Sequence, residues 1–277
     1  MNINGSIGYT LLSKDNIKVL VLADMHSTLP YCKGESIFVS DWMDRKKKSK
    51  ILLEEVPRLG STLKELWPGS PHTQKLKDLY LNSKVIDGVD VRPFLIPFSW
   101  ELISEDKELG KVTLYEYLTL IDFFFQLKHK FFIKNLGNIY TKDYLKDSKL
   151  GVHFLNLKNK TQALMKKNKS LIKDKTENLI DKEIMIDLNE LISLIMEWYI
   201  IAKVYKGVDE MQNNFIMHAG LAHTSNVISV LKKIYGFQVL ENVGSTDYDK
   251  DKDNITDGCL KLPNKINDLF GGAKYYY

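Results

Sequence analysis

Apolar residues form short runs near both ends of the chain and longer, helix-spaced stretches between them, a pattern that predicts an α/β protein. Residues 9–12 and 17–22 are mostly apolar and flank the polar segment 13–16, which favours a hairpin turn. Helical spacing follows from Ile37 to Met43, and residues 51–53 form a second short apolar run. Strand, helix and strand in this order predict a βαβ unit with a parallel strand pair.

Residues 63–81 also have helical spacing, and residues 85–93 read as a third strand that the proline at 93 stops. The middle of the chain has a different pattern. The next segments are an apolar helix, a lysine-rich stretch and a long amphipathic helix, over residues 112–133, 141–183 and 184–205. We therefore expect a helical insertion or lid over residues 104–210.

The α/β pattern resumes after this insertion. Residues 215–217 predict a strand, residues 225–235 a helix and residues 237–243 the last core strand. The sequence thus predicts a mostly parallel central sheet made from two βαβ-type halves in one compact domain. The first half spans residues 1–103, and residues 211–277 hold the second half and the C-terminal tail.

Composition narrows the class of protein only a little. The 277 residues are 44% hydrophobic and 27% charged, as in ordinary globular proteins. The 39 basic and 35 acidic residues leave a net charge of +4, spread through lysine-rich stretches. Such dispersed charge gives no clear nucleic-acid signal, and a solvated helix face is favoured over an anionic-lipid surface. The excess of lysine over arginine is typical of an AT-rich genome.

Location is the next expectation. No apolar run reaches the length of a membrane span, and residues 1–5 lack the start of a signal peptide. The two cysteines, Cys32 and Cys259, lie far apart in the sequence, so we expect no disulfide and a reducing compartment. These observations predict a soluble, intracellular, cytoplasmic protein.

Histidines and carboxylates stand at predicted strand ends, where parallel α/β sheets bind their ligands. Asp24 and His26 follow the first apolar run and project to the same side of an extended segment. Glu54 and Glu55 end the second run, and a buried strand tolerates a carboxylate only when it is paired. His26 with either glutamate therefore forms a candidate metal or hydrolytic site.

Two further pairs extend this site. Asp90 and Arg92 share a face at the end of the third predicted strand, where Arg92 can hold an anionic group or simply pair with Asp90. His218 and His223 flank a strand-to-helix turn at Gly220, and glycine permits such a turn. The other histidines occur in charged or inserted segments and are expected at the surface: His72, His129 and His153.

Together these motifs resemble the TIKI/TraB and erythromycin-esterase-like superfamily. The late motif, residues 220–223 followed by Gly236, Phe237 and Val239, matches the family pattern G-x-x-H before a helix and a closing strand. Glu54 or Glu55 fits the family's glutamate strand, whereas Ala23 stands where the early motif has glycine. The resemblance covers the first hundred and the last seventy residues. It implies that the histidines and the glutamate converge on one site, as in metal-dependent proteases or esterases.

The leading hypothesis is therefore a hydrolase of a peptide or small-molecule ester. His26, Glu54 or Glu55, and His223 would bind a divalent metal such as Mn, Co or Zn, with Asp24, Asp90 and His218 behind them and Arg92 stabilising developing charge. A metal-free variant would use His26 or His223 as the general base.

Two alternatives remain. Asp24-x-His26 also resembles the opening motif of calcineurin-like metallophosphoesterases, but their G-D-x-x-D and G-N-H motifs are missing from the sequence. The other alternative is a catalytically degenerate relative that acts as a binding or host-interaction protein. The sequence does not define the oligomeric state.

Overall fold

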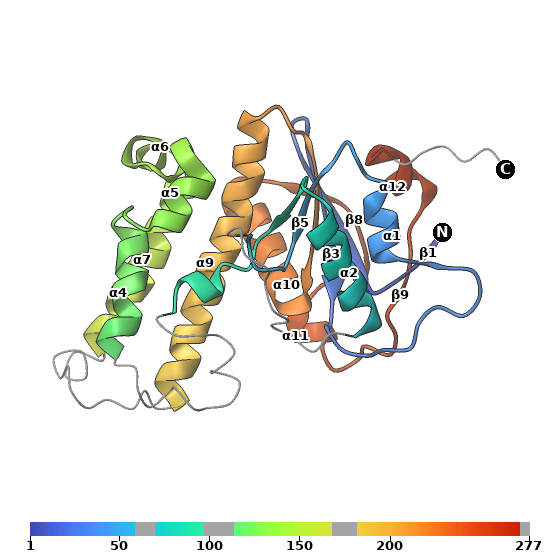
Figure 1. Cartoon of the computed structure of the whole chain (residues 1–277), viewed down its shortest axis with the longest axis horizontal. Coiled ribbons are helices and arrows are strands. Elements are labelled where there is room, and N and C mark those ends of the chain that lie inside the picture. The colour runs from blue at the N-terminus through green and yellow to red at the C-terminus, as the bar shows by residue number, and fades with distance from the viewer. Residues whose placement is uncertain (59–69, 97–113, 168–181, 272–277) are drawn as a thin grey trace. The chain divides into compact units, whose positions relative to one another are not determined.

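The protein, known here from a computed structural model, is described over residues 1–58, 70–96, 114–167 and 182–271 (Figure 1). The chain divides into two compact units. The first combines Met1–Val89 with Gly207–Tyr277, and the second is Asp90–Lys206. The divisions thus fall at 90 and 207, compared with the 104 and 210 expected for the insertion.

Among the described residues, the first unit is built on a six-stranded, mostly parallel sheet in the order β6-β5-β7-β3-β2-β8. The α/β class is therefore confirmed. Its strands are β2 (Gly8–Lys14), β3 (Ile17–Asp24), β5 (Lys50–Leu53), β6 (Ile86–Gly88), β7 (Asn214–Gly220) and β8 (Gln238–Gly244). The hairpin expected around residues 13–16 is confirmed as the antiparallel β2–β3 pair.

β7 lies between β3 and β5 and is parallel to both. The two strands of the predicted βαβ unit are therefore parallel, but the prediction that they pair was wrong, because β7, from much later in the chain, lies between them. The register places His218 opposite both Leu22 and Leu53, and Asp24 opposite Gly220. The carboxyl ends of the three strands consequently lie at one edge of the sheet.

Helices cover both faces of this sheet (Figure 1). On one face α1 (Val39–Asp44), α2 (Pro71–Asn82) and α12 (Asn264–Leu269) bury a core that includes Trp42, Tyr80 and Phe270. On the other face α10 (Leu221–Val230) contacts β3 and β7. Each fully buried apolar side chain contributes about 1.5–3 kcal/mol, so these layers hold the strand ends in place.

Several predicted boundaries differ in the structure. Residues 37–38 form the short strand β4 (Ile37–Phe38), because they pair with β1 (Asn2–Asn4) before α1 begins. The third core strand ends at Gly88, and Arg92–Phe94 forms a 3-10 turn, η1. β8 is not a core strand: it pairs only with β2 among the described residues and is largely exposed. Part of the predicted helix 63–81 lies outside the described residues.

A disulfide joins Cys32 and Cys259, so the prediction of unpaired cysteines was wrong. β1 brings the two together: Asn4 lies opposite Cys259 in β9 (Cys259–Lys261), and its side-chain oxygen accepts the backbone N–H of Cys32 at 2.9 Å. The sequence separation of 227 residues conceals this proximity. Since disulfides persist mainly in oxidising compartments, the expectation of a reducing compartment loses its basis.

The second unit is helical. Its described elements after η1 are α4 (Leu114–Phe125), α5 (Lys130–Leu136), η3 (Gly137–Tyr140), α6 (Lys142–Lys146), α7 (Lys149–Lys167) and most of α9 (Lys182–Asp209). The single helix expected over residues 112–133 is interrupted between α4 and α5, where Leu127 adopts a φ of 59°. The ring of Phe124 contacts those of Phe132, Phe154 and Trp198 in the core of this unit.

Some of the predicted segments cannot be compared with the structure. Part of the lysine-rich stretch, residues 168–181, lies outside the described residues, as do residues 97–113 and the end of the tail, 272–277. Throughout the described ranges, no helix has both the length and the apolar character needed to cross a bilayer.

Candidate functional site

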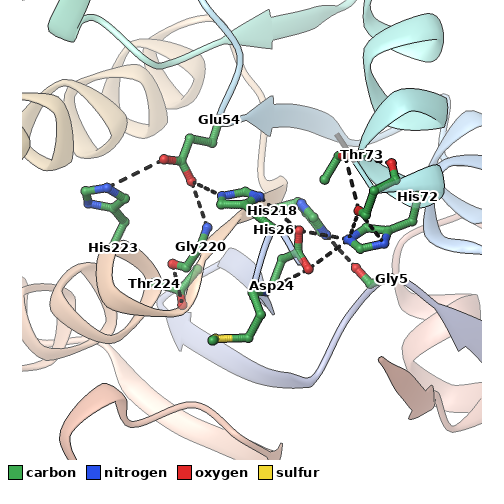
Figure 2. Close-up of polar contacts among 12 residues, drawn as sticks. Gly5, Asp24, His26, Glu54, His72, Thr73, His218, Gly220, His223 and Thr224 are labelled. Carbon is green, nitrogen blue, oxygen red and sulfur yellow. Dashed lines mark hydrogen bonds and ion pairs between the residues drawn. The ribbon is translucent and has the colours of Figure 1, made fainter. Parts of the chain in front are cut away.

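Three side chains from separate parts of the first unit meet where the parallel strands end: His26, Glu54 and His223 (Figure 2). His26 lies two residues after β3, Glu54 directly follows β5, and His223 lies in the first turn of α10. The Nε2 atom of His26 is 2.9 Å from Oε2 of Glu54, and Nε2 of His223 is 3.5 Å from Oε1 of the same residue. The structure thus brings together the two histidines and one of the two glutamates singled out in the sequence.

Glu54 is the glutamate that faces this cluster. Its Oε2 atom accepts the backbone N–H of Gly220 at 2.7 Å, at the position where β7 passes into α10. The partial positive charge of a helix N-terminus favours an anionic group there. Glu55, the next residue, acts electrostatically on Tyr80 instead. Alternation along an extended chain explains why neighbouring glutamates have different surroundings.

His26 is held between two carboxylates. Its Nδ1 lies 3.0 Å from Oδ2 of Asp24, while Nε2 faces Glu54. Burial alone would lower the pKa of His26, but the hydrogen bonds to Asp24 and Glu54 outweigh it and raise this pKa to about 10. In the metal-free chain, His26 is therefore a cation at neutral pH.

The backbone of His26 is also unusual. Its φ of 52° lies in the left-handed region, which non-glycine residues seldom adopt and which costs roughly 1–2 kcal/mol. Its side chain is 44% exposed, compared with 8% for Glu54 and 14% for His223. The cluster is consequently open to solvent on the His26 side, as a site that admits a ligand must be.

Asp24 is buried behind His26 and accepts several hydrogen bonds. One oxygen accepts the backbone N–H of Met25 at 2.7 Å, and the other faces His26. Nε2 of His72 lies 2.9 Å from Oδ1. Burial would raise the pKa of Asp24, yet the hydrogen bonds from His26 and His72 outweigh it and hold this pKa well below its usual range.

The expectation that His72 lies at the surface was wrong, because it is buried in the first turn of α2. The sequence carries one usable signal: Ser70 and Pro71 mark a helix start, which places His72 in a first turn. His153 is also buried, within the second unit, so its expected exposure was wrong too. His129 is half-buried there and donates to the carbonyl oxygen of Phe94 at 2.9 Å.

His218 lies inside β7 rather than after it, and its side chain is buried. Its Nε2 donates to the carbonyl oxygen of Gly5 at 3.0 Å. Burial lowers the pKa of His218, against the opposing attraction of the Asp24 charge, so the ring stays neutral. The His218 side chain thus lies in the surroundings of Asp24, and its carbonyl oxygen accepts the backbone N–H of Glu54 at 3.1 Å.

Asp90 and Arg92 belong to the second unit. Nε of Arg92 lies 2.8 Å from Oδ1 of Asp90, and Nη2 lies 2.9 Å from Oδ2. This two-pronged ion pair is the structural alternative considered for the two residues. Their proposed roles in catalysis stay predictions.

The chemistry of the donor set fits a divalent metal. Two imidazole nitrogens and a carboxylate face one another, and a second carboxylate holds the far nitrogen of His26, as is usual for metal-binding histidines. Two ligands of one tetrahedral zinc ion lie roughly 3.4 Å apart, given bond lengths of about 2.1 Å. The distance of 3.5 Å between Nε2 of His223 and Oε1 of Glu54 has this size. The distance of 2.9 Å between Nε2 of His26 and Oε2 of Glu54 is shorter and is that of a hydrogen bond. Among the described residues, no three such side chains already stand in the arrangement of a metal site.

The sequence matches no family model, and no match was found among the curated proteins or the solved structures.

Proposed function

We propose that this protein is a hydrolase of the TIKI/TraB-like type that cleaves a peptide or ester bond at the carboxyl edge of its sheet. The observation that supports it best is the meeting of His26, Glu54 and His223, which come from segments up to 197 positions apart in the sequence. Such a convergence of imidazoles and a carboxylate at the ends of parallel strands is typical of an active site.

His26, Glu54 and His223 would hold a divalent metal ion such as Mn²⁺, Co²⁺ or Zn²⁺. Such an ion supplies Lewis acidity that makes a hydrolytic water acidic near neutral pH. The chain prepares its ligands for this role. The bond from Nδ1 of His26 to Asp24 keeps a proton on that nitrogen, so Nε2 is the atom available as a ligand.

The remaining ligands are oriented by the backbone. The N–H of Gly220 fixes one oxygen of Glu54 and leaves the other facing His223. His223 is carried on a helix whose first residue, Leu221, is buried in a small apolar cluster with Ile7 and Ala23. Each ligand is thus tied to a strand end or a helix start, and a bound cation would replace the hydrogen bond between His26 and Glu54.

In a metal-free mechanism, His26 is the less suitable of the two candidate general bases. A general base must accept a proton at the working pH, and His26 is already protonated between Asp24 and Glu54. His223, with Glu54 beside it, is the remaining candidate for that role.

A metal analysis of protein purified without a histidine tag tests the proposal. We expect one equivalent of manganese, cobalt or zinc, taken up in a titration calorimeter and lost in His223→Ala, together with hydrolysis of generic ester or peptide substrates. Hydrolysis that survives chelation would favour His223 as a base. A folded protein that binds no metal and hydrolyses none of these substrates would overturn the proposal and favour the binding-protein alternative.

A further inference from the structure

His72 is a buried histidine that is not one of the proposed metal ligands. It contacts Asp24, the carboxylate that holds the ring of His26. It lies at the start of α2, on the far side of Asp24 from His26 (Figure 2). Its Nε2 is 2.9 Å from Oδ1 of Asp24 and 3.1 Å from Oδ2. One carboxylate therefore links two imidazoles, His72 in the interior and His26 at the open side.

The other ring nitrogen of His72 faces two hydroxyl groups. Nδ1 lies 2.9 Å from Oγ of Ser70 and 3.3 Å from the hydroxyl of Tyr31. The Asp24 carboxylate only accepts, so Nε2 carries the hydrogen and Nδ1 can accept from a hydroxyl. Oγ of Ser70 also lies 3.3 Å from Nε2. The hydroxyls of Ser70 and Tyr31 are thus placed to support the ring form that donates to Asp24.

The ring of His72 also has no room to turn away. A Cβ atom placed on Gly5 would lie 2.7–2.8 Å from atoms of His72, so the backbone of Gly5 packs directly against this side chain. The carbonyl of the same glycine accepts the Nε2 hydrogen of His218. Gly5 thus confines His72 while it anchors a second buried histidine.

Without His72, Oδ1 of Asp24 would retain only the backbone N–H of Met25 among the donors described. A buried carboxylate that loses a donor is destabilised, and it regains solvation by rotating. Rotation of Asp24 would move Oδ2, the atom that holds Nδ1 of His26.

We propose that His72 is a positioning residue for His26, which acts by fixing the Asp24 carboxylate between the two rings. Its effect on metal binding rests on the proposed function, whereas its effect on the ring of His26 does not. Removing the donor at the Nε2 position should disturb the His26 ring, and restoring a donor there should rescue it.

Two substitutions of similar polarity separate these cases. In His72→Gln the side-chain amide nitrogen reaches the place of Nε2, while in His72→Asn the shorter amide does not reach Asp24. Nitrogen-detected NMR of the ring resonances, at one pH and without metal, reports the hydrogen bond at Nδ1 of His26. The protein has six histidines, and His26→Asn identifies the resonance that belongs to His26.

We expect His72→Asn to shift or broaden the Nδ1 resonance of His26 and His72→Gln to preserve it. The affinity for Mn²⁺ should fall roughly 10- to 100-fold in His72→Asn, as for other residues behind metal ligands, and less than about threefold in His72→Gln. Where His72→Asn does not fold, the double variant S70A/Y31F removes both hydroxyls that face Nδ1. It should shift the same resonance.

An unchanged His26 resonance in a folded His72→Asn protein would overturn the inference, as would an unchanged resonance in S70A/Y31F where His72→Asn does not fold. A shifted resonance in a protein that binds no metal would support the positioning role and reject the proposed function. Normal Mn²⁺ binding with an unshifted resonance would support the proposed metal site and reject the positioning role of His72.

Discussion

Glu54 accepts the backbone N–H of Gly220 through the same oxygen that faces His26, so one atom joins the end of β5 to the start of α10. The two residues are 166 positions apart. The bond places an anionic carboxylate at a helix N-terminus, where the partial positive charge stabilises it. The second oxygen of Glu54 faces His223 at 3.5 Å.

Replacing Glu54 should therefore affect the site far more than replacing its neighbour. We expect Glu54→Gln to lower the affinity for Mn²⁺ and the rate of hydrolysis by about 100-fold or more, since even residues behind metal ligands contribute 10- to 100-fold. Glu55→Gln is the matched control and should change both by less than about threefold. Calorimetry and an ester assay measure the two effects. Equal losses in both variants would contradict the assignment of Glu54.

Gly220 should tolerate no larger residue without an effect on His26. A Cβ at this position would lie 3.0 Å from Nε2 of His26 and 3.5 Å from Oε2 of Glu54, so the His26 ring must shift by a few tenths of an ångström. The φ of −55° itself suits alanine. We expect Gly220→Ala to fold and to lose roughly tenfold in metal affinity and hydrolysis, because small misplacements near a reacting centre are costly.

The control for this change is Gly258→Ala, where the nearest neighbouring atoms would be 3.7 Å or more from the added Cβ. It should behave as the unaltered protein. If Gly220→Ala also binds metal with the affinity of the unaltered protein, the close packing of Gly220 against His26 is not needed for metal binding.

Reduction of the Cys32–Cys259 disulfide should destabilise the first unit. The bond closes a loop with a sequence separation of 227, and the chain-entropy relation gives a loss of about 5 kcal/mol. For a unit of this size, such a loss lowers the melting temperature by roughly 10–20 °C. Thermal unfolding with and without dithiothreitol measures the shift. The variant C32S/C259S should melt at the lower temperature in both conditions, and a reductant effect that persists in it would point to another cause.

His153 should make stability dependent on pH. Burial, helped by the charge of Lys160, lowers the pKa of His153 to about 4. The unfolded chain binds this proton below about pH 6.5, so the stability that the neutral ring allows is intact above pH 6.5 and falls as the pH drops toward 4. The loss from this residue should approach about 3 kcal/mol.

Urea unfolding followed by circular dichroism between pH 4 and 7.5 tests this dependence. His218 contributes in the same direction, so the informative quantity is the difference between the unaltered protein and His153→Leu. This difference should vary with pH in the stated window. A constant difference would show that His153 keeps an ordinary pKa.

Local patterns were enough to predict much of the fold. Alternating and continuous apolar runs marked β2, β3, β5 and β7, because a buried strand requires them. The order of the strands in the sheet was not accessible in this way. β7 separates β3 from β5 through contacts that join distant parts of the chain, and no local spacing records them.

Local sequence patterns also predicted part of the candidate site. His26, Glu54 and His223 stand at strand ends and a helix start, and the carboxyl ends of parallel strands meet. His72 escaped detection because its partner, Asp24, lies 48 positions away and the residues that follow His72 in α2 are mostly polar. The cysteines escaped for the same reason, since only the pairing of β1 with β9 brings them together.

The central position of β7 has a consequence for synthesis on the ribosome. β3 and β5 emerge early, yet the strand that fills the space between them follows only after the whole helical unit has been made. Until then the nascent chain holds two parallel strands without their shared neighbour, and such unpaired edges attract other chains. Ribosome-bound intermediates that stop before residue 214 should therefore depend on chaperones for their solubility.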